Sequence, residues 1–174
     1  MAISNPSRLV SALQQLVSPN GPIRTARAIL AGVSDGSDAA PGDKGESPTN
    51  QTLLASAVAL TTGVASNVVG ISLTAGDWDV SGVVNFVPTV TTSITFVVCG
   101  ISSVSATTPG VDSGAIAFWQ QPATVPGGVA GYMIATPVVR FSLLSTATAF
   151  LVASSNFTVS TLKACGTIRA RRIR

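Results

Sequence analysis

Residues 77–87 read Asp-Trp-Asp-Val-Ser-Gly-Val-Val-Asn-Phe-Val, a pattern typical of a β-strand with one buried face. Side chains two positions apart point to the same side of a strand. One side therefore carries the large apolar residues Trp78, Val80, Val84 and Phe86. A tryptophan grouped with aromatic and β-branched neighbours favours a protein core, so we expect this face to pack inward. A turn at Ala75-Gly76 is expected to precede the strand.

The same enrichment in Val, Ile, Thr and Phe continues on both sides of this strand, from residue 52 to the end of the chain. Turn residues (Gly, Pro, Asn and Ser) interrupt it at spacings that suit short strands. The expected strands are 53–60, 67–74, 77–87, 92–104, 114–120, 130–142, 147–154 and 160–172. In the fourth, Ile94, Phe96 and Val98 are expected to share one face. About eight strands without intervening helices predict an all-β fold, an antiparallel sandwich or jelly roll.

Two amphipathic helical patterns precede this body and predict an N-terminal arm over residues 1–32. Asn5 can cap the first helix, Pro6 suits its first turn, and leucines recur on one face. Such short helices must dock either on the chain's own domain or on a partner, and we expect the arm to act as an anchor. The candidate docking residues are Leu9, Leu13, Leu16, Arg24 and Arg27.

Residues 33–51 combine Gly, Pro, Ser and acidic residues with almost no apolar ones. This composition is typical of a flexible, solvated linker. The predicted organisation is therefore an arm (1–32), a linker (33–51) and a β body (52–174).

Charge is scarce in most of the chain. Only 10% of the 174 residues are charged, and residues 51–162 contain four charges, Asp77, Asp79, Asp112 and Arg140, where average usage would give about 28. The same 112 residues contain 30 Ser or Thr, and hydroxyls lose water at lower cost than ions do. We expect a surface of this kind to be covered by copies of the same chain or by a scaffold, with a homotrimer as the first expectation.

Several function classes are excluded or disfavoured by composition. The chain has no histidine, which removes Ser-His-Asp, Cys-His and zinc-histidine chemistry, and we expect neither catalysis, a metal nor a cofactor. No stretch has the roughly 18 uninterrupted apolar residues of a spanning helix, so a membrane is not expected as a partner. Cys99 and Cys165 are interpreted as small buried thiols, with a bridge left open.

Three features nevertheless invite a functional interpretation. Asp77 and Asp79 lie on one side of a strand and could serve a hydrolase or bind calcium, although acids on the outer face at a strand start are the favoured interpretation. Trp78 is expected in the core, whereas Trp119 stands at a strand end and could stack on a sugar ring, or be buried in a core or a subunit interface.

The third feature is the arginine-rich C-terminal segment, in which Arg169 and Arg171 alternate with Ile168 and Ala170. This alternation predicts a final strand with one basic face. No aromatic residues are interleaved, which argues against nucleic acid as a partner. Contact with a neighbouring subunit and simple solvation remain open, and the candidate subunit-contact residues are Arg169, Arg171 and Arg172.

Two phrases of the sequence, SLTAGDWDVSG at residues 72–82 and GTIRARR at 166–172, resemble recurrent phrases of small structural proteins of tailed bacteriophages and prophages. The resemblance spans about residues 55–174. It implies a virion part of the capsid-decorating, head-fibre or tail-fibre type, assembled in the bacterial cytoplasm, and it supplies no catalytic residues.

The leading hypothesis is a capsid-decorating protein, a cement or head-fibre protein, that is anchored through its arm to the major capsid protein or another virion protein. The alternative is a tail-fibre or receptor-binding domain that recognises a host surface glycan through Trp119.

Overall fold

The computed structural model describes residues 37–126 and 131–174, and of residues 121–126 we describe the backbone. The chain divides into two compact units, one of them formed by Ser47–Ile173, which we call the body. In the other unit, residues 40–46 form turns in which the Gly42 amide donates to the Glu46 carboxylate at 2.7 Å. The expected arm, with Leu9, Leu13, Leu16, Arg24 and Arg27, lies outside the described residues.

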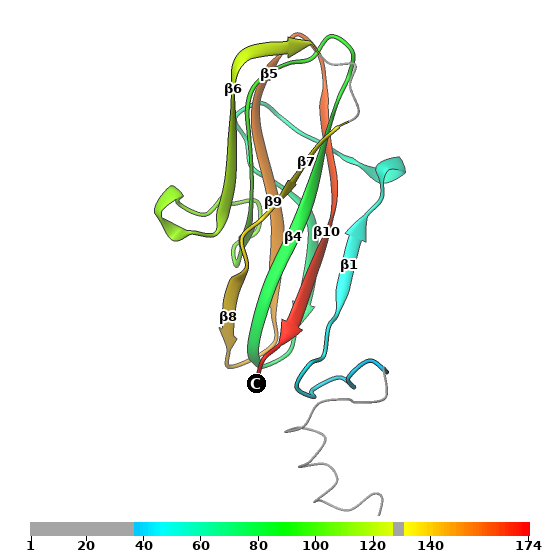
Figure 1. Ribbon diagram of the computed structural model, residues 1–174, viewed down its shortest axis with the longest axis vertical. Coiled ribbons are helices and arrows are strands. Elements are labelled where there is room, and N and C mark those ends of the chain that lie inside the picture. The colour runs from blue at the N-terminus through cyan, green and yellow to red at the C-terminus, as the bar shows by residue number, and fades with distance from the viewer. Residues whose placement is uncertain (1–36, 127–130) are drawn as a thin grey trace, which may run out of the picture. The chain divides into compact units, whose positions relative to one another are not determined.

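In its described residues the body contains ten strands and two short 3-10 helices (Figure 1). In chain order they are β1 (Thr49–Thr52), η1 (Leu54–Ser56), β2 (Val58–Ala59), β3 (Ser66–Leu73), β4 (Gly76–Pro88), β5 (Ser93–Ser102), η2 (Val111–Ser113), β6 (Ile116–Pro126), β7 (Tyr132–Ala135), β8 (Val139–Leu143), β9 (Ala147–Thr158) and β10 (Leu162–Arg172).

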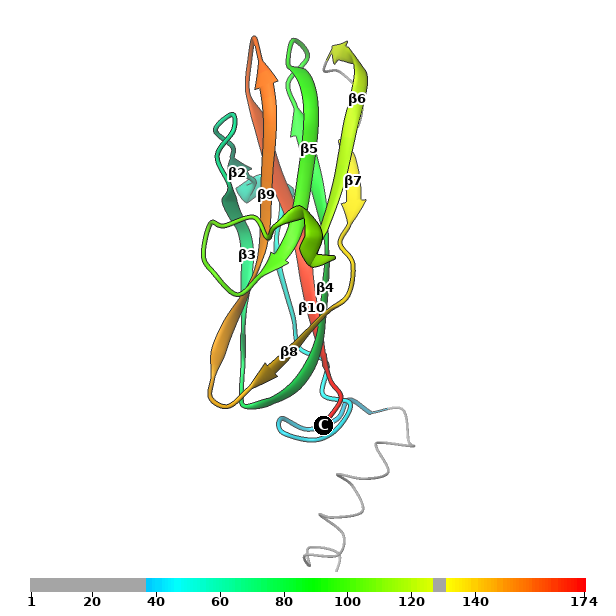
Figure 2. The same cartoon turned by 90° about the vertical axis from the view of Figure 1, so that its left-hand side faces the viewer.

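All strand pairs are antiparallel and belong to two sheets. One sheet runs β1-β10-β4-β7, with β2 also on β10 and β8 also on β4, and the other runs β3-β9-β5-β6. We call them the β4 sheet and the β5 sheet. The two views show them as facing layers, with β4 beside β10 in one and β5 beside β9 in the other (Figures 1 and 2).

The strand order is that of a jelly roll. In the β4 sheet, β1 and β2 together occupy one position beside β10, and β7 and β8 together occupy one position beside β4. Each sheet therefore has four strand positions. Successive positions then alternate between the layers as in two Greek keys, except that β5 and β6 are neighbours in one sheet. The prediction of an all-β, antiparallel fold is confirmed.

The core lies between the two sheets and is built by their inward faces. The expected inward face of β4 is confirmed, because its four large apolar side chains are all buried, with Trp78 only 1% exposed. They face Leu151 of β9 and Ile101 of β5, both buried in the same cluster. The alternation of apolar residues in β4 therefore correctly predicts which face of the strand packs against the opposite sheet.

The expected face of the fourth strand is wrong beyond Ile94. The pairing of β5 with both neighbours shifts register between Ile94 and Phe96, as in a β-bulge, which adds one residue to one strand. Val97 and Cys99 consequently join Ile94 in the core, while Phe96 turns outward. A period-2 pattern carries no mark of a bulge, so the sequence alone placed Phe96 on the wrong side.

The start of the body also differs from expectation. Thr49–Thr52, which includes the end of the expected linker, is strand β1 and pairs with β10. The expected strand 53–60 is instead η1 followed by the two-residue β2, and Leu53 and Leu54 are exposed. β1 is an exposed edge strand held by backbone hydrogen bonds, so no apolar alternation marks it.

Two glycines allow β4 and β10 to approach closely. A Cβ on Gly166 would overlap the Val83 carbonyl oxygen, and one on Gly82 would lie 2.9 Å from both the Thr167 oxygen and a Leu151 methyl. We expect Gly166→Ala to destabilise the body by about 3 kcal/mol, because the strands must separate to admit the methyl group.

Chemical denaturation monitored by far-UV circular dichroism measures this loss. Gly110→Ala is the matched control, because a Cβ there meets nothing within 4 Å and its φ of −60° suits any residue; its change should stay below about 1 kcal/mol. Equal stabilities of the two variants would contradict the close approach.

Candidate functional site

Every charged residue in the strands belongs to the β4 sheet. β3, β5, β6 and β9 contain no Asp, Glu, Lys or Arg, so the β5 sheet is free of formal charge. The charged strand residues are Asp77, Asp79, Arg140, Lys163, Arg169, Arg171 and Arg172. The few charged strand residues are thus confined to one of the two sheets. The order of residues along the chain does not reveal this division.

Asp77 and Asp79 lie on the outer side of β4, and their shared side was predicted correctly. Asp77 is 8% exposed and pairs with Arg140 of β8 through Nη2 at 2.6 Å and Nε at 3.4 Å. These hydrogen bonds and the Asp77 charge raise the pKa of Arg140, and the charge of Asp79 adds to the effect. The two acids therefore differ in environment, and Asp77 serves to join β4 to β8.

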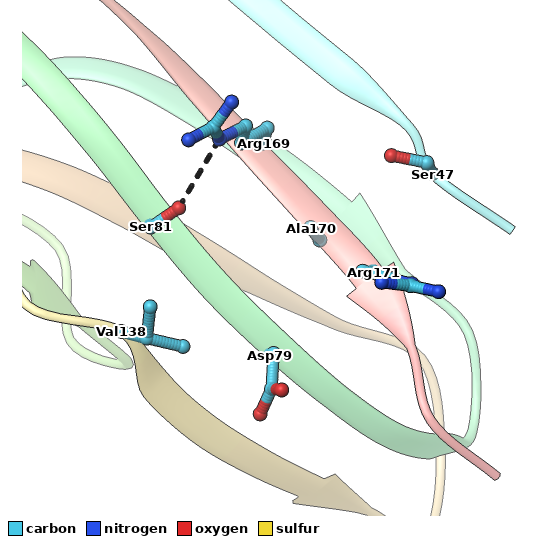
Figure 3. A pocket seen from close by; sticks show the side chains of 7 residues that line it. All are labelled: Ser47, Asp79, Ser81, Val138, Arg169, Ala170 and Arg171. Atoms are coloured by element: carbon cyan, nitrogen blue, oxygen red, sulfur yellow. Dashed lines mark hydrogen bonds between the residues drawn. The ribbon is translucent and has the colours of Figure 1, made fainter. Parts of the chain in front are cut away.

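A shallow hollow of about 330 Å³ lies on the outer side of the β4 sheet (Figure 3). Asp79 of β4 stands directly opposite Arg171 of β10 in the register, and Arg169 Nε donates to Ser81 Oγ at 3.4 Å. Figure 3 shows the two arginines and Asp79 pointing in different directions. The lining residues are Ser47, Asp79, Ser81, Val138, Arg169, Ala170 and Arg171.

This hollow lacks the convergent polar groups of a small-ligand site. A site that binds a small ligand directs several polar groups at one point, whereas these charged side chains diverge across the face. Arg169 and Arg171 are exposed on the predicted basic face of the last strand. Guanidinium groups in such positions can form forked hydrogen bonds with carboxylates of a protein neighbour.

Arg172 is a correction to the expected subunit-contact set. It is 5% exposed, its Cζ lies 4.1 Å from the Trp78 ring centroid, and Nη1 donates to the Ala75 carbonyl at 2.7 Å. Nη2 donates to Thr74 Oγ1. Arg172 pairs with Trp78 in the register and lies on the inner side of β10, so its own chain already holds it.

The contact also joins residues 72–82 to residues 166–172, two segments far apart in the chain. SLTAGDWDVSG provides Trp78 and the turn before it, where the indole Nε1 donates to the Thr74 carbonyl at 2.9 Å. GTIRARR provides the arginine that stacks on that indole. The two segments are therefore joined by a structural clasp, defined here as Thr74, Ala75, Trp78 and Arg172.

Aromatic side chains flank strand β6 at the rim of the body. Trp119, which the glycan hypothesis singled out, is 43% exposed, and its ring centroid is 5.1 Å from that of Tyr132 on β7. Phe118 is 53% exposed and lies 5.4 Å from Phe96 on β5. The Phe96–Phe118 pair has no signal in the sequence, because the bulge in β5 creates it.

Both cysteines are buried free thiols, as expected. Burial raises the pKa of Cys99 to about 12, and its Sγ lies 3.8 Å from the Ile134 carbonyl oxygen. A thiol of this kind stays protonated and unreactive at neutral pH.

Within residues 37–126 and 131–174 no three His, Cys, Asp or Glu side chains gather as a metal site would require. No helix in this same part of the chain is long and apolar enough to cross a membrane.

No family model matches the chain, and no curated protein matches it. Among solved structures, the chain is similar to the crystal structure of the infectious bursal disease virus VP2 subviral particle, with a TM-score of 0.36 and 9% sequence identity. The similarity covers 75% of this chain and 30% of that chain, so this chain spans less than a third of that protein's length.

The clasp makes a prediction about stability. Arg172→Ala should lower the free energy of unfolding by about 2–4 kcal/mol, because it removes a desolvated cation–π contact and leaves the Ala75 carbonyl without its charged donor. Arg171→Ala is the matched control: this neighbouring arginine is exposed, and the change should cost less than about 0.5 kcal/mol. Urea denaturation compares the two, and similar losses would show that the clasp contributes nothing specific.

Proposed function

We propose that this chain is a structural protein of a bacteriophage virion that decorates the capsid as a cement or head-fibre protein. The observation that carries the proposal is the division of charge, with one whole sheet uncharged and the charged side chains spread over the other. A body of this kind offers two chemically different surfaces for assembly. The resemblance of residues 55–174 to phage structural proteins is the reason for proposing a bacteriophage virion as the particle.

The proposed roles follow the parts of the chain. The arm, with the leucine face of Leu9, Leu13 and Leu16, anchors the protein to the major capsid protein or another virion protein. The body, for which we propose a trimer, projects from the shell or clamps neighbouring capsomers. Arg169 and Arg171 contact a protein neighbour, whereas Arg172 stays bound within its own chain as part of the clasp. The protein is assembled into virions in the host cytoplasm.

Deleting residues 1–32 tests the anchor. The body has its own core within Ser47–Ile173, so the truncated protein should fold and keep the oligomeric mass of the full chain. It should be missing from purified particles, because the docking residues are gone. Particle composition by mass spectrometry, with the full-length chain as control, measures this. Normal incorporation of the truncated chain would overturn the anchoring role.

A second candidate function is recognition of a host surface glycan by a tail-fibre domain. The observation that favours it is the exposed Trp119 ring beside Tyr132, since an aromatic ring with an exposed face can stack on a sugar. Aspartates on the charged face would add hydrogen-bond acceptors, but Asp77 is already paired with Arg140.

The glycan function predicts saturable binding to host polysaccharide on an array. Trp119→Ala should then weaken binding at least about tenfold, the order of one lost aromatic contact. Leu144→Ala, at a fully exposed apolar residue between β8 and β9, should bind as the unaltered chain does. An array without binding, or an indifferent Trp119→Ala, would count against this function.

A further inference from the structure

Strand β6 is an edge strand of the charge-free sheet. β5 pairs with one side of it, and within the described residues its other side pairs with no strand. Soluble proteins usually protect such an edge with lysine, proline or a bulge, because its free N–H and C=O groups can pair with another chain. The segment Ile116–Gln120 has no lysine or proline, because Pro122, Pro126 and the register shift of β6 against β5 all come after it.

Exposed aromatic rings stand on both sides of this edge. Neighbouring residues of a strand point to opposite faces, so Phe118 and Trp119 flank β6. Phe118 is supported by Phe96 at 5.4 Å, and Trp119 by Tyr132 at 5.1 Å. We call Phe96, Phe118, Trp119 and Tyr132, with the free edge of β6, the β6 surface. Aromatic rings exposed at an unpaired edge are typical of protein interfaces.

The absence of charge indicates which partner fits. In a symmetric assembly, residues near the axis meet their own copies, so a charged residue there would face a like charge. The β3, β5, β6 and β9 strands contain no charged residue and can meet themselves without that cost. A contact of the β4 sheet with its own copy would carry that cost wherever Arg169 or Arg171 lay near the axis.

We propose that copies of this chain meet through the β6 surface. The occupant of the surface is a second copy, which buries Phe118 and Trp119 and pairs with or covers the free edge of β6. The basic face of β10 is thereby left for a neighbour of a different kind. This inference deepens the proposed function, on which it rests for the expectation that the chain assembles.

The test is the mass of the purified full-length chain by light scattering on a size-exclusion column at tens of micromolar. The unaltered chain should elute as a multiple of 17.5 kDa. Phe118→Lys places a charge at the edge and should shift the mass to that of one chain, or raise the dissociation constant at least tenfold. Leu144→Lys is the matched control, because Leu144 is also apolar and is fully exposed but lies outside the β6 surface. The mass of this variant should equal that of the unaltered chain.

Tryptophan fluorescence gives an independent measurement. The chain has two tryptophans, and Trp78 is buried in the core, so a change in solvent contact on dissociation reports Trp119. Dilution of the unaltered chain should shift the emission to the red, and Trp119→Phe should abolish the shift. Thermal unfolding of Phe118→Lys checks that it remains folded.

A monomeric unaltered chain, or a folded Phe118→Lys that keeps the oligomeric mass, would overturn the inference. These results are distinguishable from failure of the proposed function. A monomer that still enters particles refutes the β6 surface alone, whereas an oligomer that never enters particles refutes the virion role alone. Glycan binding through Trp119 in the assembled protein would also contradict the burial proposed for it.

Discussion

The antiparallel pairing of β4 with β10 is the contact on which the rest of the body depends. It is a continuous ladder from Leu162 opposite Pro88 to Arg172 opposite Trp78, and the other strands of its sheet attach to one of these two. Gly166 permits the close approach along the ladder. The stacked Arg172 guanidinium holds its end, where one strand begins and the other finishes.

This ladder also separates two chemistries. Its inner side carries Trp78 and the apolar residues that meet the opposite sheet, while its outer side carries Asp79, Arg169 and Arg171. Because these ions lie on an outer sheet face, they remain hydrated and cost little to keep. The opposite layer has hydroxyl and aromatic groups in their place, which lose water more cheaply than ions. Burial between chains therefore costs less free energy for the charge-free β5 sheet. The β4 sheet is better suited to a partner that binds its charged side chains.

Much of the fold could be predicted from local pattern. Alternation in β4 identified the core face that contains Trp78, and turn residues located most strands within a few positions. Prediction failed where a backbone event or a long-range partner decides the outcome. The bulge in β5 reversed the expected direction of Phe96, and β1 is held by hydrogen bonds to β10 without any apolar signal. Arg172 looked like a surface charge because its aromatic partner is almost a hundred residues away in the chain.

The sequence by itself determined the fold class, the core face of β4, the basic face of β10 and the scarcity of charge, because each is a property of composition or of nearest neighbours along a strand. Only the tertiary structure decided that all strand charges share one sheet, that Arg172 is held by Trp78 while Arg169 and Arg171 stay exposed, and that Phe96 supports Phe118 at an open edge. These facts depend on which strands become neighbours. That choice is made by the packing and pairing of segments far apart in the chain, which no local pattern records.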